Sequence, residues 1–407
     1  MTNRHASSRA SSRKGSQKYN YKEQPLREVV SLRFRQITPS ATVSLNNKLS
    51  ELKEKGEDVI SFAVGEPDST TPEEIINFAA EKAREGKTHY TASSGISELR
   101  QKVALKYSSM TGKEISEKNV IVTPAKFALN MAVQAVIEQG DNVLIQDPSF
   151  VSYPEIIKIA GGKPRYFPST DSGSPDIEEM KEMIDERTKM IVINSPSNPH
   201  GWVASSSDLK GVADVATDSN LFVLSDEIYE HIIYEGSHIS ILSMPGMEGR
   251  TFVVNGFSKS HAMTGWRIGY LISPSEFAGY IDSYQQHTIT CAPSISQYAA
   301  LKAIEETAFP ENLRRTFQRR RDLLHSILAG SDGIEFRKPS GTFYAFPKLT
   351  NGMSGEEFSS GLLEQKKVLV TPGSGFGPSG KNRIRLSFAL SDNDLEEGAR
   401  RIVDFLK

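Results

Sequence analysis

The chain has 407 residues, of which 38% are hydrophobic and 24% charged, so it is long enough for two ordinary domains. The formal net charge of −2 excludes a strong overall field that would draw the whole chain to nucleic acid or to a membrane surface. A single cysteine, Cys291, excludes a disulfide within the chain, and no apolar run approaches the roughly 20 residues that span a bilayer. We therefore expect a cytoplasmic protein with no nucleic-acid or membrane partner.

The N-terminal segment differs from the rest of the chain. Its first twenty residues are rich in serine and basic residues and contain no acid. Organelle transit peptides share this composition, but the few apolar residues here cannot form an apolar helical face. We favour a disordered basic tail over residues 1–24. Residues 25–65 are expected to form an N-terminal arm and part of a smaller domain.

Helix and strand signals follow in chain order. A helical pattern opens at Pro39-Ser40-Ala41-Thr42 and runs toward Gly56, and a short strand is expected at 60–64. The next helix is predicted to start with Thr71 as its cap, Pro72 at its first position and Glu74 completing a capping box. Its end is expected at Gly86.

Beyond Glu117, short apolar runs alternate with amphipathic stretches of helical length. The runs are at 120–122, 143–145, 190–193, 221–224 and 251–254, with a further candidate strand at 268–272. Runs that are apolar at every position indicate strands buried on both faces, and the helices between them indicate a mostly parallel sheet. The fold class predicted is therefore α/β, with residues 66–295 forming a large domain around this sheet.

The remaining residues, 296–407, are predicted to form a smaller α+β domain. A long charged helix is expected at about 312–328, strands at 342–346 and 383–388, and a last helix from Asp392 to the end.

Polar clusters follow several of the predicted strands. They lie at 123–126, 147–150, 194–201, 226–229 and 255–259. In open parallel sheets a ligand binds outside the carboxyl ends of the strands, so a cofactor is expected where these clusters meet.

Lys259 and Asp226 are the candidates for chemistry in these clusters. A lysine with a lowered pKa can form a Schiff base with an aldehyde, although most lysines are simply solvated at the surface. A carboxylate at the end of a buried strand needs a partner, which could be a protonated pyridine nitrogen. Taken by itself, Asp226 is more readily explained as a helix N-cap.

Three further features suggest anion binding or a hydrogen-bond donor held in a fixed position. Arg267 and the helix start at 123–126 could hold a phosphate. The two X-Pro steps in 194–201 suggest an unusual backbone with a cis bond that would fix Asn198, or else an ordinary loop. Arg385, which alternates with apolar residues, would suit a substrate carboxylate in a cleft, or could lie on the surface of an edge strand.

Ordered motifs extend from about residue 33 to Lys407. They are Pro39-Ser40-Ala41-Thr42, Gly65-Glu66-Pro67-Asp68, Tyr90 with Gly95-Ile96 and Leu99-Arg100, Val151-Ser152-Tyr153-Pro154, Asn198-Pro199, Ser225-Asp226-Glu227-Ile228-Tyr229, Ser258-Lys259, Met263-Thr264-Gly265-Trp266-Arg267-Ile268-Gly269-Tyr270, Pro339-Ser340-Gly341-Thr342-Phe343-Tyr344 and Ile384-Arg385-Leu386-Ser387. Together they resemble the fold-type I enzymes that use pyridoxal 5′-phosphate (PLP), in particular the class I/II aminotransferases close to bacterial and archaeal aspartate aminotransferase.

The resemblance implies a ping-pong transfer of an amino group from an L-amino acid to a 2-oxo acid through a Schiff base on Lys259. It implies cofactor contacts from Asp226 to the pyridine nitrogen, from Tyr229 and Asn198 to the 3-oxygen, from Phe150 to the ring, and from Ser258, Arg267 and the amides near Ala125 and Lys126 to the phosphate. Arg385, helped by Gly65 and Asn198, would bind the substrate carboxylate. Tyr90 would reach the neighbour's phosphate in a homodimer. No metal is implied.

The chain departs from the usual family pattern in four places that are expected around the cofactor. Phe150 replaces Trp, the loop at 124–127 is one residue shorter, His200 replaces Thr, and Asp147-Pro148-Ser149 replaces Ser-Pro-Tyr. These departures put an assignment specific to aspartate in doubt. A dicarboxylate substrate needs a second cation, for which Lys126 and Arg100 are the candidates.

Two alternatives stay open beside the aminotransferase. A PLP-dependent β-lyase would use the same lysine but release ammonia and pyruvate from one amino acid. A PLP-binding regulator would need a DNA-binding module, and the region before residue 33 is too short and too polar for a helix-turn-helix.

Overall fold

The computed structural model describes residues 30–170 and 172–407. Residues up to Ile37 and residues from Thr38 onward form two separate units. Within the described part of the first unit lies one short helix, α2 (Leu32–Arg35). The predicted tail at 1–24 lies outside the described residues. Across those that are described, every helix is too short or too polar to cross a membrane.

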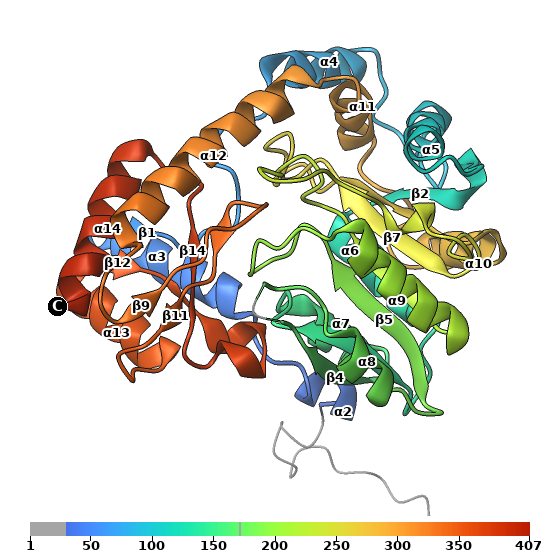
Figure 1. Cartoon of the computed structure of the whole chain (residues 1–407). Helices are drawn as coiled ribbons and strands as arrows, with labels where there is room; N and C mark the ends of the chain where they lie inside the picture. Colours follow the sequence, from blue (N-terminus) through green and yellow to red (C-terminus); the bar gives the residue numbers. More distant parts are fainter. Residues whose placement is uncertain (1–29, 171) are drawn as a thin grey trace, which may run out of the picture. The chain divides into compact units, whose positions relative to one another are not determined.

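A seven-stranded sheet forms the framework of residues 38–407, and its strands run from teal through green to yellow in Figure 1. The strand order is β2-β8-β7-β6-β5-β3-β4, for β2 (Val120–Thr123), β3 (Asn142–Asp147), β4 (Lys163–Pro168), β5 (Thr188–Asn194), β6 (Phe222–Asp226), β7 (Thr251–Gly256) and β8 (Gly269–Ile272). All neighbours pair in parallel except β8, which is antiparallel to both β2 and β7. The predicted mostly parallel sheet is confirmed.

Helices cover both faces of this sheet. One face packs against α6 (Ala125–Gln134), α7 (Ser152–Ile159) and α10 (Ser275–Gln286) through an apolar cluster that includes Ile145, Val192 and Leu224. The opposite face packs against α8 (Ile177–Glu182) and α9 (Ser206–Asp218), and further along against α4 (Glu73–Arg84), α5 (Ser97–Thr111) and α11 (Ser294–Ala303). Burial on both faces explains why the inner strands contain runs that are apolar at every position, such as 143–145 and 190–193.

The remaining strands form three small sheets. Their orders are β10-β14-β13, β1-β12 and β11-β9, for β1 (Ile60–Ser61), β9 (Ile334–Glu335), β10 (Tyr344–Ala345), β11 (Lys348–Leu349), β12 (Val368–Leu369), β13 (Thr371–Pro372) and β14 (Ile384–Ser387). The helices α3 (Ala41–Glu54), α12 (Ala308–Leu328), α13 (Gly355–Lys366) and α14 (Asp392–Leu406) belong to the same region. Strand β1 pairs in parallel with β12, so a segment near residue 60 completes a sheet made by residues near 368.

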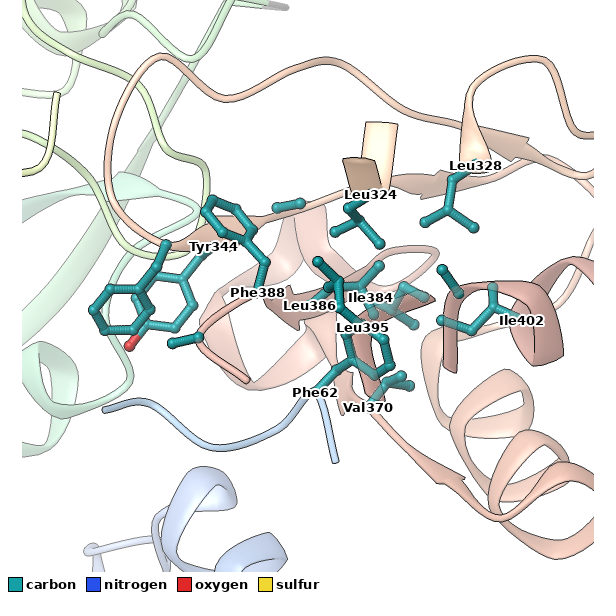
Figure 2. Close-up of a cluster of buried hydrophobic side chains, with 14 of the residues drawn as sticks. Phe62, Leu324, Leu328, Tyr344, Val370, Ile384, Leu386, Phe388, Leu395 and Ile402 are labelled. Carbon is teal, nitrogen blue, oxygen red and sulfur yellow. The ribbon is translucent and has the colours of Figure 1, made fainter. Parts of the chain in front are cut away.

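A second hydrophobic cluster fills this region. Figure 2 shows it between helices and small strands, with Phe62, Leu324, Ile384, Leu395 and Ile402 among its labelled members. All five are buried, and they come from β14, α12, α14 and the segment after β1. The predicted helix and strands beyond residue 296 are thus found, while the domain boundaries at 65 and 295 remain predictions.

One local prediction was wrong, and one strand was missed. Helix α4 begins at Glu73 after Pro72, and no side chain caps it. The hydroxyl of Thr71 instead donates to the carbonyl of Ala262 at 2.8 Å and accepts from the indole of Trp266 at 3.0 Å. Strand β4 was not predicted, because it lies at the sheet edge, half exposed, and its sequence forms no continuous apolar run.

Candidate active site

A cavity of about 290 Å³ lies at the carboxyl ends of the parallel strands. Every residue predicted to contact the cofactor or the substrate α-carboxylate lines it except Tyr90: Gly65, Ala125, Lys126, Phe150, Asn198, Asp226, Tyr229, Ser258, Lys259, Arg267 and Arg385. They come from the segments that follow β1, β2, β3, β5, β6 and β7, from the end of β6 and from β14. The sheet topology therefore gathers polar clusters that lie far apart in the sequence, as the parallel-sheet argument predicted.

Lys259 follows β7, and its amine is enclosed by other cavity residues. Its Nζ donates to the carbonyl oxygen of Gly65 at 2.7 Å. Burial lowers the pKa of Lys259 to about 8; the nearby cations Arg385 and Arg267 act in the same direction, and Glu66 opposes them. A substantial fraction of the amine is then neutral near physiological pH, which is the form that attacks a carbonyl carbon. The alternative of a solvated surface lysine was wrong.

Asp226 ends β6, and a turn rather than a helix follows it. Its Oδ2 accepts from the Tyr153 hydroxyl at 2.8 Å, and its Oδ1 accepts from the backbone N–H of Ile228 at 3.3 Å. Burial raises the pKa of Asp226 to about 6, and the Tyr153 bond opposes that rise. The helix-cap interpretation was wrong, because no helix starts here. A buried carboxylate facing a cavity suits a cationic ring nitrogen as its partner.

Arg385 lies on β14, the middle strand of its sheet, and is buried. Its Nη1 donates to Asn198 Oδ1 at 3.2 Å and its Nη2 to the carbonyl of Ala63 at 2.9 Å. The guanidinium lies 4.4 Å from the ring centre of Tyr344 and 4.9 Å from that of Phe376. The position on an exposed edge strand, the alternative considered from sequence, was wrong.

The charge of Arg385 lacks a carboxylate partner within residues 30–170 and 172–407, and its buried Nε has no hydrogen bond there. Burial lowers its pKa. A buried, unpaired guanidinium is costly unless an anion binds it. The arrangement therefore fits a carboxylate ligand that pairs with the guanidinium.

A second anion seat lies at the start of α6. Pro124 precedes this helix without a side-chain cap, so the first backbone N–H groups of α6 are open to a ligand. Arg267 lies in the same cavity with a φ of +54°, a left-handed conformation that costs about 1 kcal/mol or more in a non-glycine residue. Its Nη1 donates to the carbonyl of Thr264 at 2.9 Å. These groups and Ser258 could hold a phosphate.

Comparison with known proteins identifies the family. The family model "Aminotransferase class I and II" matches residues 57–402. The chain belongs to the aminotransferase class I and II family. It is a PLP-dependent aminotransferase, and the predicted family, fold and cofactor are confirmed. The donor set of the cavity fits PLP, since it offers a lysine amine, a buried carboxylate and a phosphate seat.

Individual relatives carry different substrates in their names. The chain is 38% identical to the aspartate aminotransferase of Geobacillus stearothermophilus, over 92% of this chain and 98% of that protein. It is 40% identical to the (5-formylfuran-3-yl)methyl phosphate transaminase of Methanocaldococcus jannaschii, over 88% and 94%. The solved aspartate aminotransferase of Thermus thermophilus with maleate superposes with a TM-score of 0.88 at 36% identity, covering 93% and 99%.

Three predicted positions of the aminotransferase lie outside the cavity. Tyr90 is 86% exposed and is not among the residues that line the cavity. Arg100 donates to the carbonyls of Glu117 and Val120, which excludes it as a second substrate cation in this cavity. His200, expected around the cofactor, instead lines a separate cavity of about 240 Å³.

Sequence reasoning gave no role to two tyrosines that border the cavity. Tyr153 holds Asp226, and Tyr344 lies against Arg385 while its hydroxyl accepts from Tyr229 at 3.2 Å. Both belong to motifs quoted for the resemblance, so their presence was visible but their contacts were not. Over the described residues, no cluster of His, Cys, Asp and Glu is arranged to hold a metal ion.

Proposed function

We propose that this aminotransferase moves an amino group from L-aspartate to 2-oxoglutarate in two half-reactions, with Lys259 carrying the cofactor. One observation carries the proposal: the amine of Lys259, the carboxylate of Asp226 and the guanidinium of Arg385 line a single cavity. Nucleophile, ring partner and substrate anchor are therefore close enough to act on one bound molecule.

Bound PLP supplies an electron sink for the electrons left when a substrate C–H bond breaks. Asp226 would keep the ring nitrogen protonated, because a carboxylate facing that nitrogen favours its charged form. Asn198 would donate to the 3-oxygen, and Tyr229 would do so by turning its hydroxyl hydrogen from Tyr344 toward that oxygen. Lys259, whose amine lies in the cavity, would be the base that moves the proton of the substrate Cα.

The other residues orient the two molecules. Phe150 would pack on the ring face, while Ser258, Arg267 and the first amides of α6 would hold the phosphate. Asn198 holds the guanidinium of Arg385 through its side-chain oxygen, which leaves its NH2 group as the donor for the cofactor. Because Arg385 receives the α-carboxylate of both the donor and the acceptor, the same residue serves both half-reactions.

An acidic side chain on the substrate needs a second cation, and Lys126 supports that role. It lines the cavity with its amine 5.5 Å from the ring centre of Phe150. Burial and the charge of Arg267 lower its pKa, and an anion bound near both cations would relieve their repulsion and favour the charged amine. No carboxylate within residues 30–170 and 172–407 forms an ion pair with it.

We also propose a cytoplasmic homodimer in which Tyr90 completes the neighbour's phosphate seat. The segment that follows Tyr90 is tied to α10, since Gln285 donates to the carbonyl of Ser93 at 2.5 Å. Helix α10 exposes Tyr280 and Tyr284 close to that point. Exposed aromatic side chains gathered in this way are typical of a surface that is covered by a partner.

The test of the substrate proposal is a donor panel on wild type and on Lys126→Gln. Wild type should convert L-aspartate faster than L-phenylalanine or L-alanine. The variant should lose about tenfold or more in kcat/KM for aspartate and little for alanine, because only aspartate carries the second carboxylate. Equal losses for both donors would reject the role of Lys126. Ammonia and pyruvate formed without any oxo acid would identify a β-lyase instead.

A further inference from the structure

Asp147 forms an anchor between two segments that are distant in the sequence. It ends β3, and its carboxylate accepts from Ser379 three times: from the hydroxyl at 2.8 Å and from the backbone N–H at 3.0 Å and 3.3 Å. A Cβ added to Gly377 would lie 2.3 Å from Oδ1 of Asp147, and Gly377 has a φ of +135°. The approach of this carboxylate therefore requires glycine at 377.

One side of the Asp147 anchor leads to the ring-stacking side chain. Phe150 lies three residues after Asp147, and the intervening Ser149 donates its backbone N–H to the carbonyl of Phe376 at 2.7 Å. The Phe150 ring packs edge-on against Tyr153, with ring centres 5.5 Å apart. Tyr153 is the residue that holds Asp226. The loop at 147–150 is thus fixed between the anchor and the site.

The other side leads to the substrate anchor. Phe376 precedes Ser379 by three residues and is buried. Its ring lies 4.9 Å from the guanidinium of Arg385 and packs edge-on against Phe346 at 5.8 Å. The carboxylate of Asp147 therefore joins the loop that carries Phe150 to the segment whose Phe376 packs against Arg385.

We propose that Asp147 is a positioning residue that sets the placement of Phe150 and Arg385 together through Ser379, and so tunes cofactor affinity and substrate-carboxylate affinity at once. This proposal rests on the proposed roles of Phe150 and Arg385. The position is also one at which the chain departs from the Ser-Pro-Tyr pattern of the family that it resembles. A serine at 147 would offer one oxygen in place of two and could not accept the bonds to both carboxylate oxygens.

The test is a double-mutant cycle on Asp147→Asn and Ser379→Ala. The asparagine keeps the size of Asp147 but places an NH2 group where Ser379 N–H needs an acceptor. The affinity for PLP is measured by fluorescence titration of the cofactor-free protein, and KM and kcat for donor and acceptor by steady-state kinetics. Folding of each variant is followed by circular dichroism and urea unfolding.

We expect Asp147→Asn to weaken PLP binding and to raise KM for both substrates by about tenfold, with kcat changed less than about threefold. Ser379→Ala should raise KM by about threefold, since its backbone bond remains. The effect of the double variant should be smaller than the sum of the two single effects, because both changes weaken the contact between the side chain of Asp147 and Ser379.

Asp208→Asn is a matched control. Asp208 accepts from the hydroxyl of Ser205 at 2.6 Å and from its backbone N–H at 2.9 Å, at the start of α9. It shares the bonding pattern but is not a cavity residue, so its loss should reduce stability without changing KM or PLP affinity. Effects of Asp147→Asn equal to those of the control, or additive with Ser379→Ala, would overturn the proposal.

Failure of the proposal and failure of the proposed function give different results. If Lys259→Ala retains the absorbance of lysine-bound cofactor, the proposed function fails. If Lys259→Ala loses that absorbance while Asp147→Asn binds PLP and substrates as wild type does, only the positioning role fails. Should Asp147→Asn not fold, Ser379→Ala alone decides, and an unchanged KM in that variant rejects the role.

Discussion

The enclosed amine of Lys259 should make the cofactor-free aminotransferase less stable than a variant that lacks it. Burial lowers the pKa of Lys259 from 10.5 to about 8. Between these two pH values the unfolded chain binds more protons than the folded protein, so the stability of wild type rises with pH across this window. Below pH 8 the folded protein bears the full cost of a charged amine in the cavity.

The size of this cost follows from the two pKa values. Their difference corresponds to about 3 kcal/mol for a group that is well buried. Lys259→Met removes the charge but also the bond to Gly65, which offsets about 1 kcal/mol of the gain. The side chain of Lys259 is only partly buried, so solvent screens the charge further. We therefore expect the variant to be more stable by about 1–2 kcal/mol at pH 7, with the gain disappearing as the pH approaches 10.

Urea unfolding of the two cofactor-free proteins, at equal protomer concentration and from pH 7 to 9.5, measures this difference. Lys210→Met on α9 is the control, because Lys210 is exposed and its loss should not change the pH dependence. If Lys259→Met is less stable than wild type at pH 7, or if the difference does not vary with pH, the reasoning about burial is refuted.

Three further substitutions test the site. Arg385→Lys should raise KM for both donor and acceptor by about 100-fold, since an amine cannot replace the planar guanidinium, while the lysine-bound cofactor is retained. A change in KM for only one of the two substrates would contradict a shared anchor. Asp226→Asn should reduce the half-reaction rate by about 100-fold or more. Because burial raises the pKa of Asp226 to about 6, the affinity of wild type for PLP should weaken as the pH falls from 7 to 5. Titration of the cofactor-free wild type and variant with PLP at several pH values checks this. Gly65→Ala should raise KM several-fold, as its Cβ would lie 2.9 Å from Oη of Tyr344, and unchanged kinetics would reject the tight fit.

The central sheet could be predicted because its strands are buried on both faces. Runs such as 190–193 are apolar at every residue, and where such runs alternate with helices the pattern indicates a parallel sheet. Strand β4 lies at the edge with exposed residues, so its pattern is weak. The predicted cap of α4 was wrong for another reason. The hydroxyl of Thr71 bonds to the distant Trp266 instead of to the start of its own helix, and the local sequence does not reveal such a partner.

Prediction of the site depended on the topology. Parallel strands place their carboxyl ends at one edge, so Asp226 and Lys259 could be expected to meet before any contact was known. The alternation of apolar and polar residues around Arg385 did not show whether its side chain lies in a cleft or on the surface. That depends on β14 being the middle strand of its sheet, which requires pairing with β10 and β13 from other parts of the sequence. The Asp147 anchor was not predicted, since it joins residues 232 positions apart.

The absorbance of the PLP-loaded protein during one half-reaction tests the central role of Lys259 most directly. L-aspartate is added without any oxo acid, and 2-oxoglutarate follows. We expect the band of the lysine-bound cofactor to disappear with aspartate, the band of the amino form of the cofactor to grow, and 2-oxoglutarate to restore the starting spectrum, with Lys259→Ala showing none of these changes. A wild-type spectrum that does not respond to any amino donor, or a Lys259→Ala spectrum that responds as wild type does, would contradict the role of Lys259.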